Sequence, residues 1–501
     1  MSIDISTRAE LLELMAGLAP GSGVAEHESR DEASFFRNFL PLPDHGRALD
    51  PDIFLILGGR GAGKTELFRV LDYPRGLEAL SVGQKVVLPF APTNTHWVPA
   101  FGRTHLEGAA FPTQEALLQQ LDVTNSLQLR AFWLGLAVGR LLNRLGGTPL
   151  GLEWAAALSS EELAGLRETS RVSRWLPLAV SRLESVNDAL DRLDLLLRRT
   201  DRWLFLTYDE LDRLLPSYSQ LSAPIRELLA LWLDRWRRWE RIRPKIFLRN
   251  DLFREEYLAF PDASKLRGHR VELTWQRASL YRLVAKRMLN AGYPLREYVQ
   301  QFFAPVRLQD TDLLGVLPDN DEAGFRSLVG AMVGKYMGTD KRRGVTYNWI
   351  PNHLQDAAGQ IAPRSFLNLF SLAAETSRQK PGGLAGTALL QPTDLQGALM
   401  DTSDYRIREL QDEYPWIEAL RGSLKDLEVP AWMRDFLGAL GRTQWNPDDE
   451  RTLPDTSTRA VFGLLKDIGV VTVRTDGRVN VPDIYLYGFR LKRKGGIKRR
   501  Q

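Results

Sequence analysis

Short hydrophobic runs separate longer amphipathic stretches along the first half of this chain. Three runs have the length of a strand, at residues 53–57, 203–208 and 245–249, and each is followed by glycine or polar residues. Unbroken runs of this kind are typical of strands that are buried on both faces of a parallel sheet. Residues 85–90 predict one more strand, and leucines at helical spacing predict a helical insertion at about 105–200. The pattern therefore predicts an α/β fold built on a parallel sheet.

The last third of the chain has a different pattern, in which helices lead into a short hairpin. Apolar residues at helical spacing predict a helix behind Pro363, and Thr393 with Gln396 fits a capping box that starts another helix. A further helix is predicted at 455–466. Alternating valines on both sides of 475–477 then predict a two-stranded hairpin. A helix followed by a two-stranded wing is similar to a winged-helix domain.

The composition excludes several classes of protein. The 501 residues are 44% hydrophobic and 26% charged, as in an ordinary globular protein of several domains. No apolar run reaches the roughly 18 residues of a membrane span, and the N-terminus lacks the pattern of a secretion signal. There is no cysteine, and the six histidines show no ligand spacing, so we expect no disulfide and no structural metal. We expect a cytoplasmic location and no membrane partner.

The net charge of +4 is small for this length, but it is unevenly distributed. After Asp483 the chain has no acidic residue. The basic residues of this tract are Arg490, Lys492, Arg493, Lys494, Lys498, Arg499 and Arg500. Such tracts attract phosphate-rich partners, although terminal charge runs are as often solvated tails. Residues 456–501, with Arg474 and Arg478 on the predicted wing, are therefore the candidate contact with duplex DNA, and a protein contact is the alternative.

The first predicted strand runs into a segment that fits the phosphate-binding pattern G-x-x-x-x-G-K-[ST]. The glycines allow successive backbone N–H groups to close around phosphate oxygens, and the helix behind them adds the positive end of its dipole. Lys64 is expected on the β- and γ-phosphates and the Thr65 hydroxyl on Mg²⁺. The nucleotide-binding candidates are Gly58, Gly59, Arg60, Gly61, Ala62, Gly63, Lys64, Thr65 and Glu66. The alternative is a glycine-rich turn in another α/β fold.

The second predicted strand ends in two acidic residues, Asp209 and Glu210. Open α/β sheets bind ligands at the carboxyl ends of their strands, so both motifs direct polar groups to one edge. We expect Asp209 to hold Mg²⁺ and Glu210 to orient and polarise the attacking water. The alternative is an ordinary acidic loop behind a buried strand.

Two further residues are candidates for sensing the γ-phosphate. Asn250 follows the third predicted strand, with Arg249 as its rival and ordinary turn chemistry as the alternative. Arg364 lies in the first turn of the helix that Pro363 starts, which holds it at a fixed place. The alternative for Arg364 is an arginine that solvates a helix start.

A phosphate loop, an Asp-Glu strand end, a polar strand end and a Pro-Arg helix start are together similar to the AAA+ superfamily. The layout looks most like its initiator (origin-recognition) branch and the related STAND signalling ATPases, in which a small helical lid and a winged helix follow the core. The resemblance covers roughly residues 50–375, and extends to about 490 with the winged helix. It implies ATP as the nucleotide and a homo-oligomer. It also implies an arginine finger that acts on a neighbouring subunit, for which Arg267 and Arg270 are candidates.

Five segments follow from the patterns and the resemblance together. They are an N-terminal helical segment at 1–50, a P-loop ATPase core at 51–280, a helical lid at 281–377, a winged-helix domain at 390–490 and a basic tail at 491–501. About 140 residues separate the two nucleotide motifs, far more than a βαβ unit needs. This departs from the family pattern, and we assign the excess to the helical insertion as a recognition surface.

The primary hypothesis is a Mg²⁺-dependent ATPase that forms oligomers and couples ATP binding and hydrolysis to a DNA or protein partner. One alternative is a STAND-like nucleotide-gated switch, of the kind found in bacterial antiviral sensors, with little turnover before its partner is detected. Another is a DNA-bound initiator or loader scaffold. The sequence shows no nuclease, protease or deaminase constellation, so an effector activity would belong to a separate protein.

Overall fold

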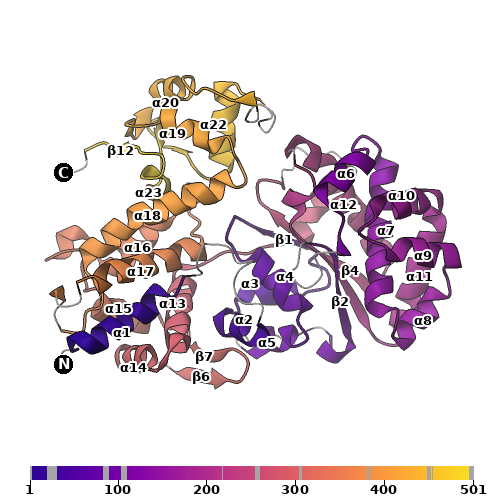
Figure 1. Ribbon diagram of the computed structural model, residues 1–501, viewed down its shortest axis with the longest axis horizontal. Helices are drawn as coiled ribbons and strands as arrows, with labels where there is room; N and C mark the ends of the chain where they lie inside the picture. Colours follow the sequence, from indigo (N-terminus) through magenta and orange to yellow (C-terminus); the bar gives the residue numbers. More distant parts are fainter. Residues whose placement is uncertain are drawn as a thin grey trace. The chain divides into compact units, whose positions relative to one another are not determined.

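In the computed structural model the chain forms two compact units (Figure 1). It begins in unit 1, continues through unit 2 and returns to unit 1. Unit 1 consists of Met1–Leu40 and Thr274–Gln501, and unit 2 consists of Pro41–Leu273. The structure describes residues 3–19, 31–82, 88, 90–102, 110–216, 218–253, 260–303, 307–380, 383, 384, 386–447, 449, 453 and 455–495. Of the strand predicted at 85–90, only residues 88 and 90 are described, and residues 496–501 of the predicted basic tail lie outside the described residues.

A five-stranded sheet forms the centre of unit 2, and all its neighbouring strands are parallel. The strands are β1 (Leu55–Gly58), β2 (Thr95–Phe101), β3 (Trp203–Tyr208), β4 (Ile242–Arg249) and β5 (Arg270–Glu272). They lie in the order β2-β3-β4-β1-β5, so β4 separates the two strands that carry the nucleotide motifs. The predicted α/β fold class with a parallel sheet core is confirmed.

The interval between β2 and β3 is helical where it is described. Its helices are α6 (Gln114–Gln120), α7 (Ser126–Leu145), α8 (Pro149–Ala155), α9 (Ser160–Arg167), α10 (Val172–Ser181) and α11 (Leu183–Arg199). Local sequence fixes where several of them start: the Asn125 side chain accepts from the Gln128 N–H at α7, and Ser159 and Glu162 form a capping box at α9. This is the predicted helical insertion.

Helices cover both faces of the sheet because its strands are apolar on both sides (Figure 1). Besides the insertion, the helices of unit 2 are α3 (Pro43–Ala48), α4 (Lys64–Asp72), α5 (Gly76–Val82) and α12 (Tyr218–Arg238). On one face, Phe247 of β4 packs against Phe68 of α4, with ring centroids 5.9 Å apart. On the other face, Tyr208 of β3 packs against Trp133 of α7 at 5.8 Å. Tyr208 is in register with Ile246 of β4, so the two residues share a face of the sheet. Phe247 follows Ile246 and therefore points to the opposite face.

Unit 1 combines the start of the chain with all of the chain from residue 274. Its first helices are α1 (Ile5–Ala16), α2 (Glu32–Asn38), α13 (Arg277–Ala291), α14 (Tyr293–Phe302), α15 (Glu322–Met332), α16 (Thr346–Leu354) and α17 (Pro363–Arg378). A two-stranded antiparallel hairpin, β6 (Leu308–Thr311) and β7 (Gly315–Pro318), lies among them. The buried Lys286 of α13 donates to the Leu314 C=O at 2.8 Å and to the Arg37 C=O, which ties α2 and the hairpin to α13.

The C-terminal part of unit 1 holds a three-stranded antiparallel sheet of order β10-β11-β9. Its elements are α18 (Pro392–Gln411), α19 (Ile417–Ser423), β8 (Glu428–Val429), β9 (Ala431–Trp432), α20 (Met433–Leu440), α22 (Thr458–Asp467), β10 (Thr472–Val473), β11 (Arg478–Asn480), α23 (Asp483–Leu486) and β12 (Lys492–Arg493). β10 and β11 form the hairpin that the sequence predicts, with Gly477 at a φ of 79° in its turn. α18 starts two residues earlier than predicted, with Gln391 and Asp394 as its capping box.

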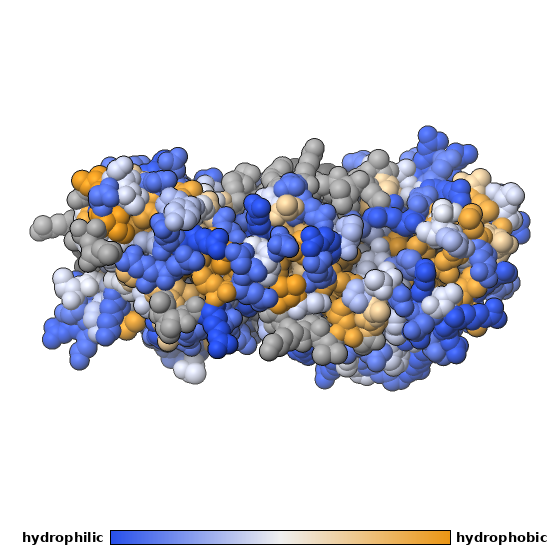
Figure 2. All heavy atoms as spheres, turned by 90° about the horizontal axis from the view of Figure 1, so that it is seen from below, coloured by the Kyte–Doolittle hydropathy of each residue, from blue (hydrophilic) through white to orange (hydrophobic). Residues whose placement is uncertain are grey.

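Among the residues that the structure describes, no helix is long and apolar enough to cross a membrane. The face drawn in Figure 2 is mainly hydrophilic, with hydrophobic residues gathered in small separate groups.

Candidate nucleotide-binding site

The predicted phosphate-binding loop connects β1 to α4 in unit 2. β1 ends at Gly58 and α4 begins at Lys64, and between them Gly61 and Gly63 have φ angles of 75° and 95°. Glycine adopts this left-handed conformation without the steric cost of a Cβ atom. The Leu67 N–H donates to the Gly63 C=O at 3.0 Å, so the first turn of α4 closes on the loop. The start of a helix behind such a loop is a ready anion site.

Lys64 lies over this loop. Its Nζ donates to the Gly58 C=O at 2.8 Å and to the Gly59 C=O at 2.9 Å. A phosphate oxygen accepts a stronger, charge-assisted bond than a carbonyl does, so it can replace these partners. Of the other predicted loop residues, Ala62 is buried, and Arg60 and Glu66 are half-buried.

Thr65 brings the two sequence motifs together. Its side chain hydrogen-bonds to the carboxylate of Asp209, which directly follows β3. The Asp209 N–H donates to the Phe101 C=O of β2 at 2.9 Å, and Asp209 is only 3% exposed. The sheet therefore joins two segments that lie far apart in the sequence.

The Asp209 carboxylate has the features of a cation ligand. Its Oδ2 atom is buried and has no hydrogen-bond partner among the described residues. Burial raises the pKa of Asp209 to about 6, although the Thr65 hydrogen bond and the Lys64 ammonium both act to lower it. Hydroxyl and carboxylate oxygens are the ligands that Mg²⁺ prefers in proteins. Thr65 and Asp209 therefore fit a Mg²⁺ ion that is shared with phosphate.

Glu210 has an unusual backbone conformation for a residue with a side chain. Its φ is 52°, in the left-handed region, where it precedes the 3-10 helix η5 (Leu211–Arg213). Its side chain is 10% exposed and forms an ion pair with Arg213 at 3.5 Å. Strained positions of this kind are common at functional sites. The backbone geometry therefore makes this strand end a functional candidate independently of the sequence motif.

No family model and no curated protein matches this chain. Two solved structures do. One is the Walker-type ATPase of Pyrococcus abyssi, with 15% identity, a TM-score of 0.39, and coverage of 91% of this chain and 99% of that one. The other is the Aeropyrum pernix ORC2 protein in its ADPNP–ADP complexes, with 13% identity, a TM-score of 0.31, and coverage of 92% and 99%.

The two residues considered at the end of β4 lie at the same sheet edge. Arg249 is in register with Gly58 of β1. It forms a two-point ion pair with Asp251, at 3.0 and 2.9 Å. Asn250 is exposed, and its Nδ2 donates to the Glu272 Oε1 at 2.7 Å. Because Arg249 is held by an acid and Asn250 is at the surface, the geometry favours Asn250 as the group that can reach a ligand.

Three other predicted residues lie away from this edge or in the other unit. Arg364, on α17 of unit 1, forms an ion pair with Glu409 at 2.9 Å. Arg270 starts β5, so it lies at the amino end of the sheet, with its guanidinium 5.7 Å from the Phe253 ring. Arg267 is exposed in the 3-10 helix η7 (Ala263–His269). Their roles as a second sensor and an arginine finger stay predictions.

Glu272 is a polar residue of this edge that sequence reasoning missed. It ends β5, a strand of three residues that lies between a 3-10 helix and the connection to unit 1. The alternation of Val271 and Leu273 with polar neighbours is the signal that could have found this strand.

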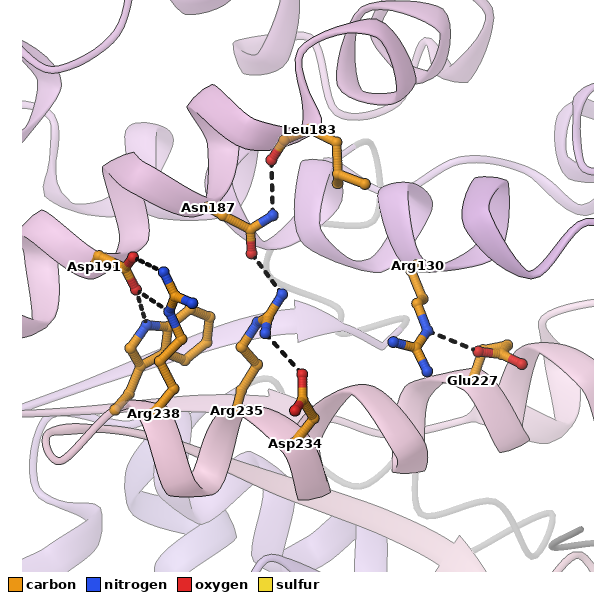
Figure 3. A network of polar contacts seen from close by, with 9 residues as sticks. Arg130, Leu183, Asn187, Asp191, Glu227, Asp234, Arg235 and Arg238 are labelled. Atoms are coloured by element: carbon orange, nitrogen blue, oxygen red, sulfur yellow. Dashed lines mark hydrogen bonds and ion pairs between the residues drawn. The ribbon is translucent and has the colours of Figure 1, made fainter. Parts of the chain in front are cut away.

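A polar network fixes the insertion to the helix that precedes β4 (Figure 3). Asp191 of α11 accepts from Arg238 Nε at 2.7 Å, and Asn187 of α11 accepts from Arg235 Nη2 at 2.8 Å. A further ion pair joins α7 to α12 in the same view. The insertion is therefore fixed to the helix that leads into β4, the strand that ends at the candidate site.

Proposed function

We propose that this chain is a Mg²⁺-dependent ATPase whose nucleotide binds in unit 2. The contact between Thr65 and Asp209 carries the proposal, because it joins the phosphate-binding loop to the acidic strand end at one point. Lys64 binds the β- and γ-phosphates, and the N–H groups of the loop bind further phosphate oxygens. The choice of ATP over other nucleoside triphosphates is supported by the AAA+ resemblance alone.

Each polar group at this edge, together with Arg364 of unit 1, has its own role in the proposed reaction. Thr65 and Asp209 hold Mg²⁺, which supplies neutralisation of phosphate charge when it is bound. Glu210 orients the attacking water and accepts its proton. Asn250 contacts the γ-phosphate or this water, and Arg364 is the second sensor.

Two substitutions test this assignment. Lys64→Ala abolishes nucleotide binding, because it removes the charge that neutralises the phosphates. Glu210→Gln keeps binding and lowers turnover by a factor of about 10² or more, the range of a lost general base. Calorimetric titration with Mg²⁺-ATP and steady-state phosphate release measure the two effects. Arg75→Gln, at a half-exposed cation paired with Glu78, is the control and leaves both unchanged. Hydrolysis at the parental rate in Glu210→Gln would refute the role of Glu210.

We further propose that the C-terminal part of unit 1 is a winged-helix domain that contacts a partner, either duplex DNA or a protein. The element order supports this: α19, β9, α20 and α22 are followed by the β10–β11 hairpin, and β9 completes the sheet. The AAA+ resemblance supports a homo-oligomer, and the sequence pattern, without a secretion signal or an apolar run of membrane length, supports a cytoplasmic location. Particle mass of the Glu210→Gln form, measured with and without ATP and duplex DNA, tests assembly and partner together. A mass that stays that of a monomer in every mixture excludes both.

One observation favours a second function, a nucleotide-gated switch that signals to a separate effector protein. The Glu210 carboxylate is already paired with the Arg213 guanidinium, and a paired carboxylate is a weaker base for water. Such a switch turns over far below the typical enzyme rate of roughly 10 per second until a partner arrives. Phosphate release near that rate from the isolated chain excludes this second function.

A further inference from the structure

The loop between α15 and α16 of unit 1 presents a concentrated positive charge to solvent. We call residues 335–345 the basic loop. Its exposed cationic residues are Lys335, Lys341, Arg342 and Arg343. All four lie within nine consecutive positions of the chain.

The basic loop has a defined conformation. Tyr336 and Val345 form an antiparallel bridge at its base, and the Met337 N–H donates to the Gly344 C=O at 2.9 Å. Met337 itself is only 3% exposed, so its side chain anchors the loop on the rest of unit 1. At the C-terminal end, the Thr346 N–H donates to the Lys335 C=O at 3.0 Å. The cations therefore project from a closed backbone, and little ordering entropy is lost when a ligand binds.

The charge of the basic loop is not neutralised by its neighbours. Among the described residues, the four cations form no ion pair. The one acidic residue of the loop, Asp340, accepts the Arg342 N–H at 2.8 Å and so caps the turn that carries the cations. Two exposed cations of unit 2 differ in this respect, because Arg171 and Arg174 both pair with Glu168.

The chemistry of the exposed residues indicates the class of partner. Protein interfaces rely on apolar and aromatic anchors at their centre, with charges at the rim. The residues that the basic loop exposes are Lys335, Gly338, Thr339, Asp340, Lys341, Arg342 and Arg343. None of these is apolar with a large side chain, so the loop offers charge without an anchor. A surface of this kind suits the phosphates of a nucleic acid, which are held by Lys and Arg without reading the bases.

We propose that the basic loop binds the phosphate backbone of duplex nucleic acid, without preference for sequence. This site is separate from the C-terminal residues 456–501 considered above for DNA. It is also independent of nucleotide binding in unit 2, so either proposal can fail alone.

The test measures duplex binding by the full-length chain. A fluorescein-labelled DNA duplex of random sequence is titrated, and its anisotropy is followed from about 50 to about 200 mM salt. Neutralising the loop with Lys335→Gln, Lys341→Gln, Arg342→Gln and Arg343→Gln removes up to four phosphate contacts. Each contact contributes about 0.9 to the slope of log K against log salt, so the slope falls by roughly 2 to 4. The affinity at about 100 mM salt falls tenfold or more.

A matched variant separates this effect from a general loss of charge. Arg171→Gln, Arg174→Gln, Arg237→Gln and Lys265→Gln remove four exposed cations that already have acidic partners, and they leave affinity and slope unchanged. The single substitution Arg342→Glu weakens binding in the same direction and guards against misfolding of the fourfold variant. The proposal is overturned by an unchanged slope in the loop variant, by an equal loss in the control, or by a parental chain that binds anionic phosphatidylserine vesicles or an acidic peptide but not the duplex.

Discussion

At the residue scale, Asp209 has a carboxylate whose burial costs stability. Its carboxylate is buried, and one oxygen has no hydrogen-bond partner among the described residues. The folded pKa of about 6 lies above the ordinary value of 3.8, so the folded state binds more protons between these values. Stability therefore falls as the pH rises from about 4 to about 6, and the loss persists above pH 6. The difference between the two pKa values corresponds to a loss of about 3 kcal/mol of unfolding free energy.

Asp209→Asn is therefore expected to stabilise the ligand-free protein. The amide carries no charge, so the free energy of unfolding at neutral pH rises by about 1–3 kcal/mol, and its fall between pH 4 and 6 is reduced. The same change removes the proposed Mg²⁺ ligand, so we expect that Mg²⁺-ATP no longer raises the midpoint of unfolding. Urea unfolding over this pH range, with and without Mg²⁺-ATP, measures both effects. A variant that is less stable than the parent at pH 7 contradicts the argument.

At the element scale, one carboxylate of the insertion supports the strand beside the site. Asp194 of α11 is buried and accepts the N–H groups of three consecutive residues where β4 begins. The donors are Glu240 at 3.1 Å, Arg241 at 2.7 Å and Ile242 at 3.0 Å. The insertion is therefore a support for β4, and β4 carries Asn250 at its far end.

Asp194→Ala should cost about 3 kcal/mol of unfolding free energy, because one buried and two part-buried N–H groups lose their acceptor. Asp188→Ala, at an exposed position of the same helix, stays within about 0.5 kcal/mol of the parent. Guanidinium unfolding of both variants gives the comparison. Equal effects from the two substitutions would mean that Asp194 supports nothing beyond its helix.

The elements also show how far sequence reasoning reaches in this chain. Strands buried on both faces are visible as apolar runs, so β1, β3 and β4 were predicted close to their observed bounds. β2 was missed because it is an edge strand in which His96 and Pro99 interrupt the apolar pattern. The three-residue β5 was missed because its alternating signal consists of Val271 and Leu273 alone, which is weak evidence for a strand.

At the scale of the whole molecule, the sequence does not predict which distant parts of the chain pack together. The sequence predicts an N-terminal helical segment, but nothing local indicates that α1 and α2 pack with α13 and α17, hundreds of residues later. The contact of Thr65 with Asp209 was predictable only because both belong to known patterns. By contrast, the Asn250–Glu272 hydrogen bond joins residues that no pattern links.

Arg364 lies in unit 1, while the phosphate-binding loop lies in unit 2. If Arg364 senses the nucleotide, Mg²⁺-ATP must protect backbone amides in both units from hydrogen exchange. We expect slower exchange in the Gly58–Thr65 loop and at the start of α17 in the Glu210→Gln form, which retains its nucleotide. Adding Arg364→Ala abolishes the protection of α17 and leaves that of the loop.

Loss of the ion pair with Glu409 could by itself loosen α17, so the control must break the same pair and keep the arginine. Glu409→Gln does this, since it removes the charge that Arg364 contacts at 2.9 Å. In this control the nucleotide still protects α17, because Arg364 remains available to the phosphate. Protection of α17 that survives Arg364→Ala, or that is lost in both variants alike, assigns the arginine to the structure of unit 1 alone.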